Sequence, residues 1–84
     1  MPLVLVIAIQ SSIDQVPEQI PVNGKVYTPR ALYCYAGNGT YGHYYAYIKG
    51  TNGWNLCDDQ LTSNVPNIPQ RGLSSGKFLI CELI

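Results

Sequence analysis

Residues 42–59, GHYYAYIKGTNGWNLCDD, decide the fold of this chain of 84 residues. The aromatic-rich segment at 43–49 is typical of a β-strand. The sequence GTNG at 50–53 is typical of a tight turn, after which residues 54–58 can return beside the first strand. This stretch therefore predicts an antiparallel hairpin.

Further strands are predicted on both sides of the hairpin. Residues 3–9, LVLVIAI, are continuously apolar and rich in β-branched side chains, which predicts a strand covered on both faces. Its cover would come mostly from later in the chain or from another chain. The pair Asn23-Gly24 predicts a turn before a short strand at 25–27, and Pro29 separates that strand from the next one at 30–35.

Residues 77–84 complete the set as a final strand, whereas two segments are predicted to be loops. Residues 11–21 and 65–75 each contain two prolines. No segment of ten or more residues has a helical period free of proline and glycine. The predicted fold class is therefore mainly β, built on an antiparallel sheet, and residues 1–84 are long enough for one domain or part of one.

Charge is sparse, with five basic and five acidic residues and a net charge of zero. This balance provides no electrostatic footprint for nucleic acid or for an anionic membrane. Either part of the surface is normally covered, or the chain is a small, poorly soluble all-β domain. The apolar run at 3–9 is too short to cross a bilayer and lacks the basic segment of a signal peptide.

Cys34, Cys57 and Cys81 are the only cysteines, and no two of them have the spacing of a metal site. All three lie in apolar or aromatic runs, which predicts reduced, buried thiols in a cytoplasmic or nuclear protein. We therefore expect no metal and no cofactor.

His43 is the only histidine, and two of the five acidic residues, Asp58 and Asp59, follow it in the hairpin. A symmetric turn pairs Lys49 with Trp54, which makes His43 and Asp58 diagonal neighbours on one face and places Asp59 on the other. A slip of one residue would exchange the two aspartates. A histidine oriented by an aspartate is half of a nucleophilic catalytic arrangement. Alternatively, His43 only begins a strand and the aspartates mark a turn.

Four segments match, in order, the sequence pattern of one enzyme family. MPLVLVIAI at 1–9 resembles the strand L-P-x-x-L-x-I-x-L, and YTPRALYCYAG at 27–37 is similar to Y-x-L-x-A-V-x-x-H-x-G. GHYYAYIK followed by WNLCDDQLT resembles a histidine box, and KFLICEL at 77–83 resembles a closing strand. The family is that of the ubiquitin-specific proteases, which are papain-like cysteine peptidases of α+β fold. Nearly the whole of this chain resembles the C-terminal half of their catalytic domain, the half that contains the palm sheet.

The resemblance implies a function for this half of the domain. The family hydrolyses peptide and isopeptide bonds after the last glycine of ubiquitin. His43 is implied as the general base for a thiol, Asp58 as the residue that orients it, and Asp59 as a supporting aspartate. Gly42 and Tyr44 are implied to contact the ubiquitin tail, beside a glycine-rich loop at 37–42 that borders its channel.

The chain also departs from the family pattern. The cysteine box, with its nucleophile and its oxyanion-stabilising asparagine, has no counterpart, and neither do the zinc-binding fingers. IQSS at 9–12 replaces L-K-R-F, Tyr35 stands where histidine is common, and Cys57 stands where an aromatic residue is usual. Cys34 lies within a predicted strand and is not expected to replace the nucleophile.

Three hypotheses remain open at the level of sequence. The first is a fragment of a deubiquitinase that is inactive alone. The second is a non-catalytic module that binds the ubiquitin tail or completes a separate cysteine-bearing lobe. The third is a structural β-domain unrelated to ubiquitin. Whether the chain is an enzyme is open, and neither nucleic acid nor membrane is expected as a partner.

Overall fold

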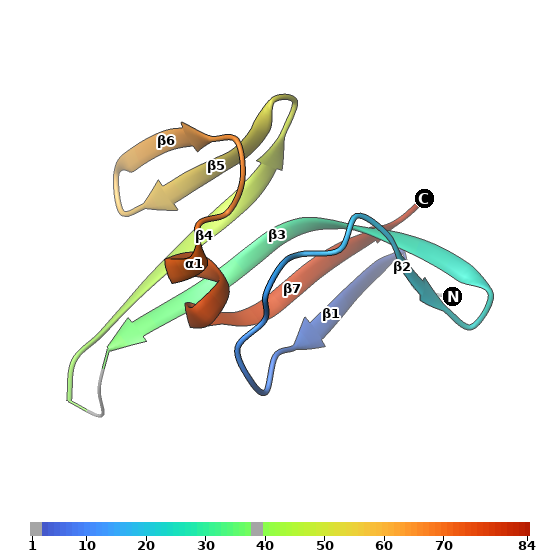
Figure 1. Ribbon diagram of the computed structural model, residues 1–84, viewed down its shortest axis with the longest axis horizontal. Coiled ribbons are helices and arrows are strands. Elements are labelled where there is room, and N and C mark those ends of the chain that lie inside the picture. The colour runs from blue at the N-terminus through green and yellow to red at the C-terminus, as the bar shows by residue number, and fades with distance from the viewer. Residues whose placement is uncertain (1–2, 38–39) are drawn as a thin grey trace.

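The computed structural model describes residues 3–37 and 40–84. Within these ranges, seven strands form one sheet with antiparallel pairing throughout, and one short helix lies against it (Figure 1). The prediction of a mainly β fold with an antiparallel sheet is therefore confirmed. The elements are β1 (Val4–Ala8), β2 (Ile20–Val22), β3 (Lys25–Gly37), β4 (Gly42–Gly50), β5 (Gly53–Asp58), β6 (Leu61–Val65), α1 (Gln70–Ser75) and β7 (Gly76–Leu83).

The strand order is β1-β7-β3-β4-β5-β6, and β2 pairs with the beginning of β3. The long strand β3 lies at the centre of the sheet, with β7 on one side and β4 on the other (Figure 1). The first strand pairs with the last, so that Val4 lies opposite Glu82. A hydrogen bond of 2.9 Å from the Leu83 amide to the Leu3 carbonyl extends this ladder by one step.

Two of the predicted turns form as expected. Asn23 and Gly24 both have positive φ, 49° and 80°, as a tight hairpin turn of type I′ requires. Residues 51–52 connect β4 to β5 and leave Lys49 opposite Trp54, the predicted register. Gly53 has a φ of 102°, and a Cβ there would collide with the backbone of Pro66. The turn therefore requires glycine at this position.

One face of the sheet, called the covered face below, carries the core. Its most deeply buried side chains come from β3, β4 and β7: Tyr27, Leu32, Cys34, Tyr47 and Cys81. Ile13 and Val16, from the connection between β1 and β2, pack against this core together with Leu73 of α1. Gly72 allows the helix to approach closely, because a Cβ there would meet the Tyr47 ring. The connection and the helix thus close the same side of the sheet.

The other face, called the open face below, carries the apolar side chains of Val4, Val6, Tyr33, Ile48 and Phe78, each more than one-third exposed. The register places them on one side, because directly opposed residues share a face. The predicted strand at 3–9 forms as β1, flanked by residues 3 and 9, but the described part of this chain covers only one of its faces, and not both as predicted. Val4 and Val6 are 52% and 58% exposed, since both covering segments lie on the opposite side.

Other sequence predictions also need correction. The predicted loop at 65–75 contains α1, which starts after Pro69 and is held by packing of Leu73 and Gly72 on the core. The two strands predicted at 25–27 and 30–35 are one strand, β3, with a register shift between Pro29 and Ala31. Strand β6 was not predicted, and the loop predicted at 11–21 ends in β2. Positions 1–2 of the first matched segment lie outside the described residues.

Across the described ranges, no helix has the length and apolar character needed to cross a membrane.

Candidate functional site

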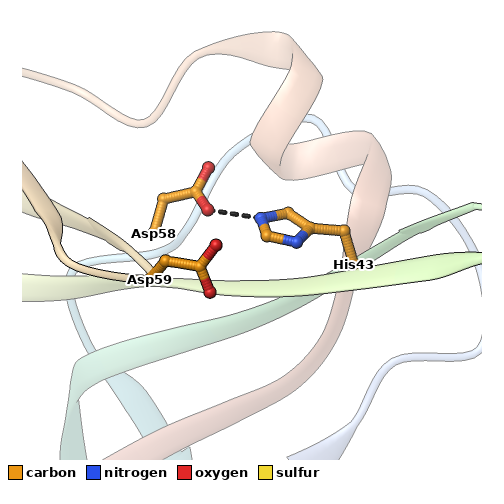
Figure 2. Close-up of side chains that lie close together, drawn as sticks. All are labelled: His43, Asp58 and Asp59. Carbon is orange, nitrogen blue, oxygen red and sulfur yellow. Dashed lines mark hydrogen bonds and ion pairs between the residues drawn. The ribbon is translucent and has the colours of Figure 1, made fainter.

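His43 and Asp58 meet at the end of the hairpin formed by β4 and β5. His43 is the second residue of β4, Asp58 is the last residue of β5, and the regular pairing of the two strands stops at Ala46 and Cys57. Beyond that point the two side chains lean toward each other, and His43 Nε2 forms a hydrogen-bonded ion pair with Asp58 Oδ1 (Figure 2). The structure thus brings together the two residues that the hairpin register makes diagonal neighbours.

Asp59 also faces His43, contrary to the alternation expected along a strand. It belongs to the two-residue turn between β5 and β6, where Asp58 lies opposite Leu61, and its φ is 56°. Because the chain reverses there, its carboxylate lies on the same side as that of Asp58 (Figure 2). One ligand-type atom from each of the three residues lies within 4.8 Å of the others. The prediction that Asp59 points to the other face is therefore wrong.

The two carboxylates favour the protonated imidazole. The hydrogen bond from His43 to Asp58 raises the pKa of His43, the charge of Asp58 adds to the effect, and the more distant charge of Asp59 raises it further. The side chains of His43 and Asp58 are 47% and 33% exposed, so water and a partner can still reach the pair. When the Nε2–H of the neutral ring donates to Asp58, Nδ1 carries the lone pair. Nδ1 has no bonding partner among the residues that the structure describes.

Tyr45 is part of the site, on the face that the hairpin register predicts for it together with His43 and Asp58. Its ring stacks on that of His43 with centroids 6.2 Å apart and an angle of 22° between the planes. Tyr45 is itself buried in the core, so the imidazole rests on a fixed surface. The spacing predicts this shared face, because residues two apart on a strand point to the same side, but the sequence assigns Tyr45 no role in the site.

None of the three cysteines is positioned as a nucleophile for His43. Cys34 is 1% exposed, and burial raises the pKa of its thiol to about 11. Burial also raises the pKa of Cys81. Cys57 is only half-buried, but it directly precedes Asp58 in β5, so its side chain points to the opposite face. The prediction of free thiols is confirmed for all three, and that of burial for Cys34 and Cys81.

Gly42 and Tyr44, the two residues expected beside the ubiquitin tail, flank His43. A Cβ at Gly42 would collide with the Tyr35 phenol, so a larger residue there would have to displace the end of the Tyr35 side chain. Tyr44 is 75% exposed and packs on Tyr35, its cross-strand partner, with ring centroids 4.6 Å apart. It points to the open face, away from the His43 ring. The expected channel loop at 37–42 includes positions 38–39, which lie outside the described residues.

His43, Asp58 and Asp59 offer one imidazole nitrogen and two carboxylates, a combination that divalent transition metals accept. The group has these three members within the described part of the chain. The sequence predicts no metal, because the three cysteines lack the spacing of a metal site and only one histidine is present. As chemistry, the arrangement is first an oriented base: one ring nitrogen is tied to a carboxylate and the other can receive a proton.

No protein-family model matches the chain, and no curated protein matches it either. The resemblance to the ubiquitin-specific proteases therefore remains a prediction.

Proposed function

We propose that this chain is the histidine-bearing half of a cysteine-type deubiquitinase of the ubiquitin-specific protease kind. It provides the base and the orienting carboxylate, while a separate cysteine-bearing lobe provides the nucleophile. The observation that carries the proposal is the His43–Asp58 pair, in which the ring is held at Nε2 and Nδ1 is left for a proton. The stacked Tyr45 ring and the nearby Asp59 carboxylate support the same role.

In the proposed reaction, His43 transfers the proton and Asp58 stabilises the charged ring. Nδ1 of His43 accepts the proton of the incoming thiol, and the thiolate attacks the carbonyl carbon of the last residue of ubiquitin. As the C–N bond breaks, Nδ1 returns the proton to the leaving amine, and Asp58 stabilises the intermediate imidazolium. Water then attacks the thioester with His43 again as base, which releases the carboxylate and restores the thiol.

The chain alone is expected to be inactive. Removal of one member of a catalytic triad lowers kcat by about 10⁴ or more, and here the nucleophile itself has no candidate. We expect no hydrolysis of a fluorogenic ubiquitin amide and no labelling by a ubiquitin probe with a thiol-reactive C-terminus. Labelling of Cys34, Cys57 or Cys81 in the chain alone would contradict the proposal.

Complementation provides the positive test. The chain is mixed with separately expressed cysteine-box lobes of ubiquitin-specific proteases, and hydrolysis of the ubiquitin amide is followed. We expect activity that depends on both partners and that His43→Ala abolishes, with Asp58→Asn lowering kcat by about 10²–10⁴. Leu61→Ser, in the exposed strand β6, serves as a variant outside the pair. Activity that survives His43→Ala would refute the assigned role.

A second candidate function, binding of the ubiquitin tail without catalysis, is favoured by the surroundings of Tyr44. Tyr35 and Tyr44 border a shallow cavity of about 330 Å³ that Phe78 also lines. An extended peptide can rest on such aromatic side chains. In an NMR titration with ubiquitin, shifts at Tyr44 that vanish for ubiquitin lacking its last two residues would support this function. An unchanged spectrum would eliminate it.

A further inference from the structure

A second cavity lies on the covered face, built from residues other than those around His43. Its volume is about 560 Å³, and its lining includes none of His43, Asp58 and Asp59. The buried side chains of Trp54, Ile68 and Leu73 contribute its apolar part. Residues 14–18 of the connection between β1 and β2 form another side. The cavity is therefore independent of the proposed deubiquitinase site.

Two carboxylates without partners line this cavity. Asp14 and Glu18 are both exposed, and across residues 3–37 and 40–84 neither side chain has an ion pair or a hydrogen bond. By contrast, Glu82 pairs with Arg30 at 2.8 Å, and Asp58 pairs with His43. The cavity lining contains no basic residue. Its negative charge is thus available to a ligand.

Trp54 is the aromatic wall of the cavity, and its indole ring already contacts a cation, Lys49, that is not part of the cavity lining. Lys49 Nζ lies 5.0 Å from the centroid of the indole ring. Lys49 lines a neighbouring cavity of about 300 Å³, which also touches Trp54 and Glu18, but it does not line the larger cavity. An indole is the side chain on which cations bind best. The larger cavity thus combines an aromatic wall with two unpaired carboxylates.

We propose that this cavity binds the side chain of an arginine residue from a partner protein. Its volume falls within the range of about 300–1,000 Å³ that is usual for ligand sites. Ile68 and Leu73 can cover the methylene stem of the arginine, as apolar surfaces do for long basic side chains. The planar guanidinium pairs with carboxylates through two parallel hydrogen bonds and stacks on indole rings, which a lysine ammonium does less well.

The test uses the only tryptophan of the chain as a reporter. Fluorescence of Trp54 is followed while the full chain is titrated with a capped Gly-Arg-Gly peptide, and then with its lysine and citrulline counterparts. We expect saturable binding of the arginine peptide, binding of the lysine peptide weaker by about threefold or more, and none of the uncharged citrulline peptide. Equal binding of the citrulline peptide, or tighter binding of the lysine peptide, would overturn the proposal.

Variants locate the site. Asp14→Asn combined with Glu18→Gln keeps the side-chain shapes and removes both charges, and should weaken arginine binding by about tenfold or more. Glu82→Gln, a carboxylate paired with Arg30 outside the cavity, is the matched control and should leave it unchanged. Circular dichroism checks that each variant is folded. Unaltered binding by the double variant, or no response of the wild-type chain at about 10 mM peptide, would refute the site.

The outcome is separable from that of the deubiquitinase proposal. His43→Ala should bind the arginine peptide as the wild-type chain does, because His43 does not line the cavity. Loss of binding in His43→Ala would contradict the proposed location. Failure of the complementation assay would leave the expected peptide titration unchanged.

Discussion

The two faces of the sheet both carry apolar side chains from β1, but only one of them is covered by other segments of the chain. In β1, Leu5 and Ile7 of the covered face alternate with Val4 and Val6 of the open face, and all four are apolar. Only the covered face receives side chains from α1 and from the connection between β1 and β2. The difference shows that burial in this chain is decided by where the two covering segments lie, and not by the apolar character of a strand.

The candidate site occupies the border of the covered face. Tyr45 and Tyr47 are buried in the core, whereas His43, two residues before Tyr45 on the same strand face, is about half exposed. The imidazole therefore has a rigid support on one side and solvent on the other. Such a position suits a base that must hold its orientation and still reach a partner.

The largest expected effect on stability comes from creating a cavity in the core of the covered face. Leu32→Ala removes a side chain with no exposed surface and should lower the free energy of unfolding by about 2–5 kcal/mol. Val4→Ala, on the open face, should cost about 0.5 kcal/mol or less. Urea denaturation followed by Trp54 fluorescence measures both. If Leu32→Ala does not fold, Leu32→Val tests the same position at a cost of about 1 kcal/mol. Equal losses at Leu32 and Val4 would contradict the contrast between the faces.

The next effect comes from displacing the helix that covers the core. Gly72→Ala places a methyl group against the Tyr47 ring and should lower the free energy of unfolding by about 1–3 kcal/mol. Ser74→Ala, an exposed position of the same helix, should change it by less than about 0.5 kcal/mol. Thermal unfolding by circular dichroism compares them. A neutral Gly72→Ala would show that the close approach of α1 is not needed for stability.

A third prediction concerns the candidate site and the pKa of His43. Asp58→Asn should lower the pKa of His43 toward its ordinary value, since Asp58 is the main cause of the increase, and Asp59→Asn should lower it less. Because the pKa of His43 is raised in the folded chain, the contribution of the pair to stability is complete below the unfolded pKa of about 6.5. It is lost as the pH rises through the folded pKa.

NMR of the single imidazole reads this titration directly. Asp14→Asn, which lies outside the site, is the control and should leave the pKa of His43 where it is. A larger decrease with Asp59→Asn than with Asp58→Asn would exchange the roles of the two aspartates.

The smallest effect on stability is expected on the open face. Val6→Thr keeps a β-branched side chain and should change the free energy of unfolding by about 0.5 kcal/mol or less. The same change should reduce self-association, because exposed apolar patches promote it. Light scattering at increasing concentration measures this property. Unaltered association in Val6→Thr would show that the open face does not drive it.

The sequence predicted those parts of the fold that depend on local chemistry. The GTNG turn predicts both the hairpin and its register, and the register makes His43 and Asp58 neighbours. The predicted orientation of Asp59 is wrong because the alternation of side chains along β5 ends at this residue, where φ becomes positive. The presence of an aspartate in the sequence does not by itself predict a positive φ.

Tertiary packing accounts for the remaining differences. Helix α1 has only six residues, too few for a periodic signal, and it is held by contacts of Gly72 and Leu73 with the core. The sequence also does not predict which face of β1 is covered, because the residues that point to each face are all apolar. The cavity beside Trp54 requires residues 14–18 to lie close to that side chain, a placement that no local pattern encodes.

The pairing of β1 with β7 has a consequence for the time course of folding. Val4 can find its partner only after position 82 has been synthesised, so this ladder closes a loop that runs from position 4 to position 82. Contacts so distant in sequence slow the folding of small domains. Until β7 arrives, β1 is an apolar segment without hydrogen-bond partners, the kind of segment that chaperones shield during synthesis. The interval before the two strands meet is therefore when this protein is most vulnerable to aggregation.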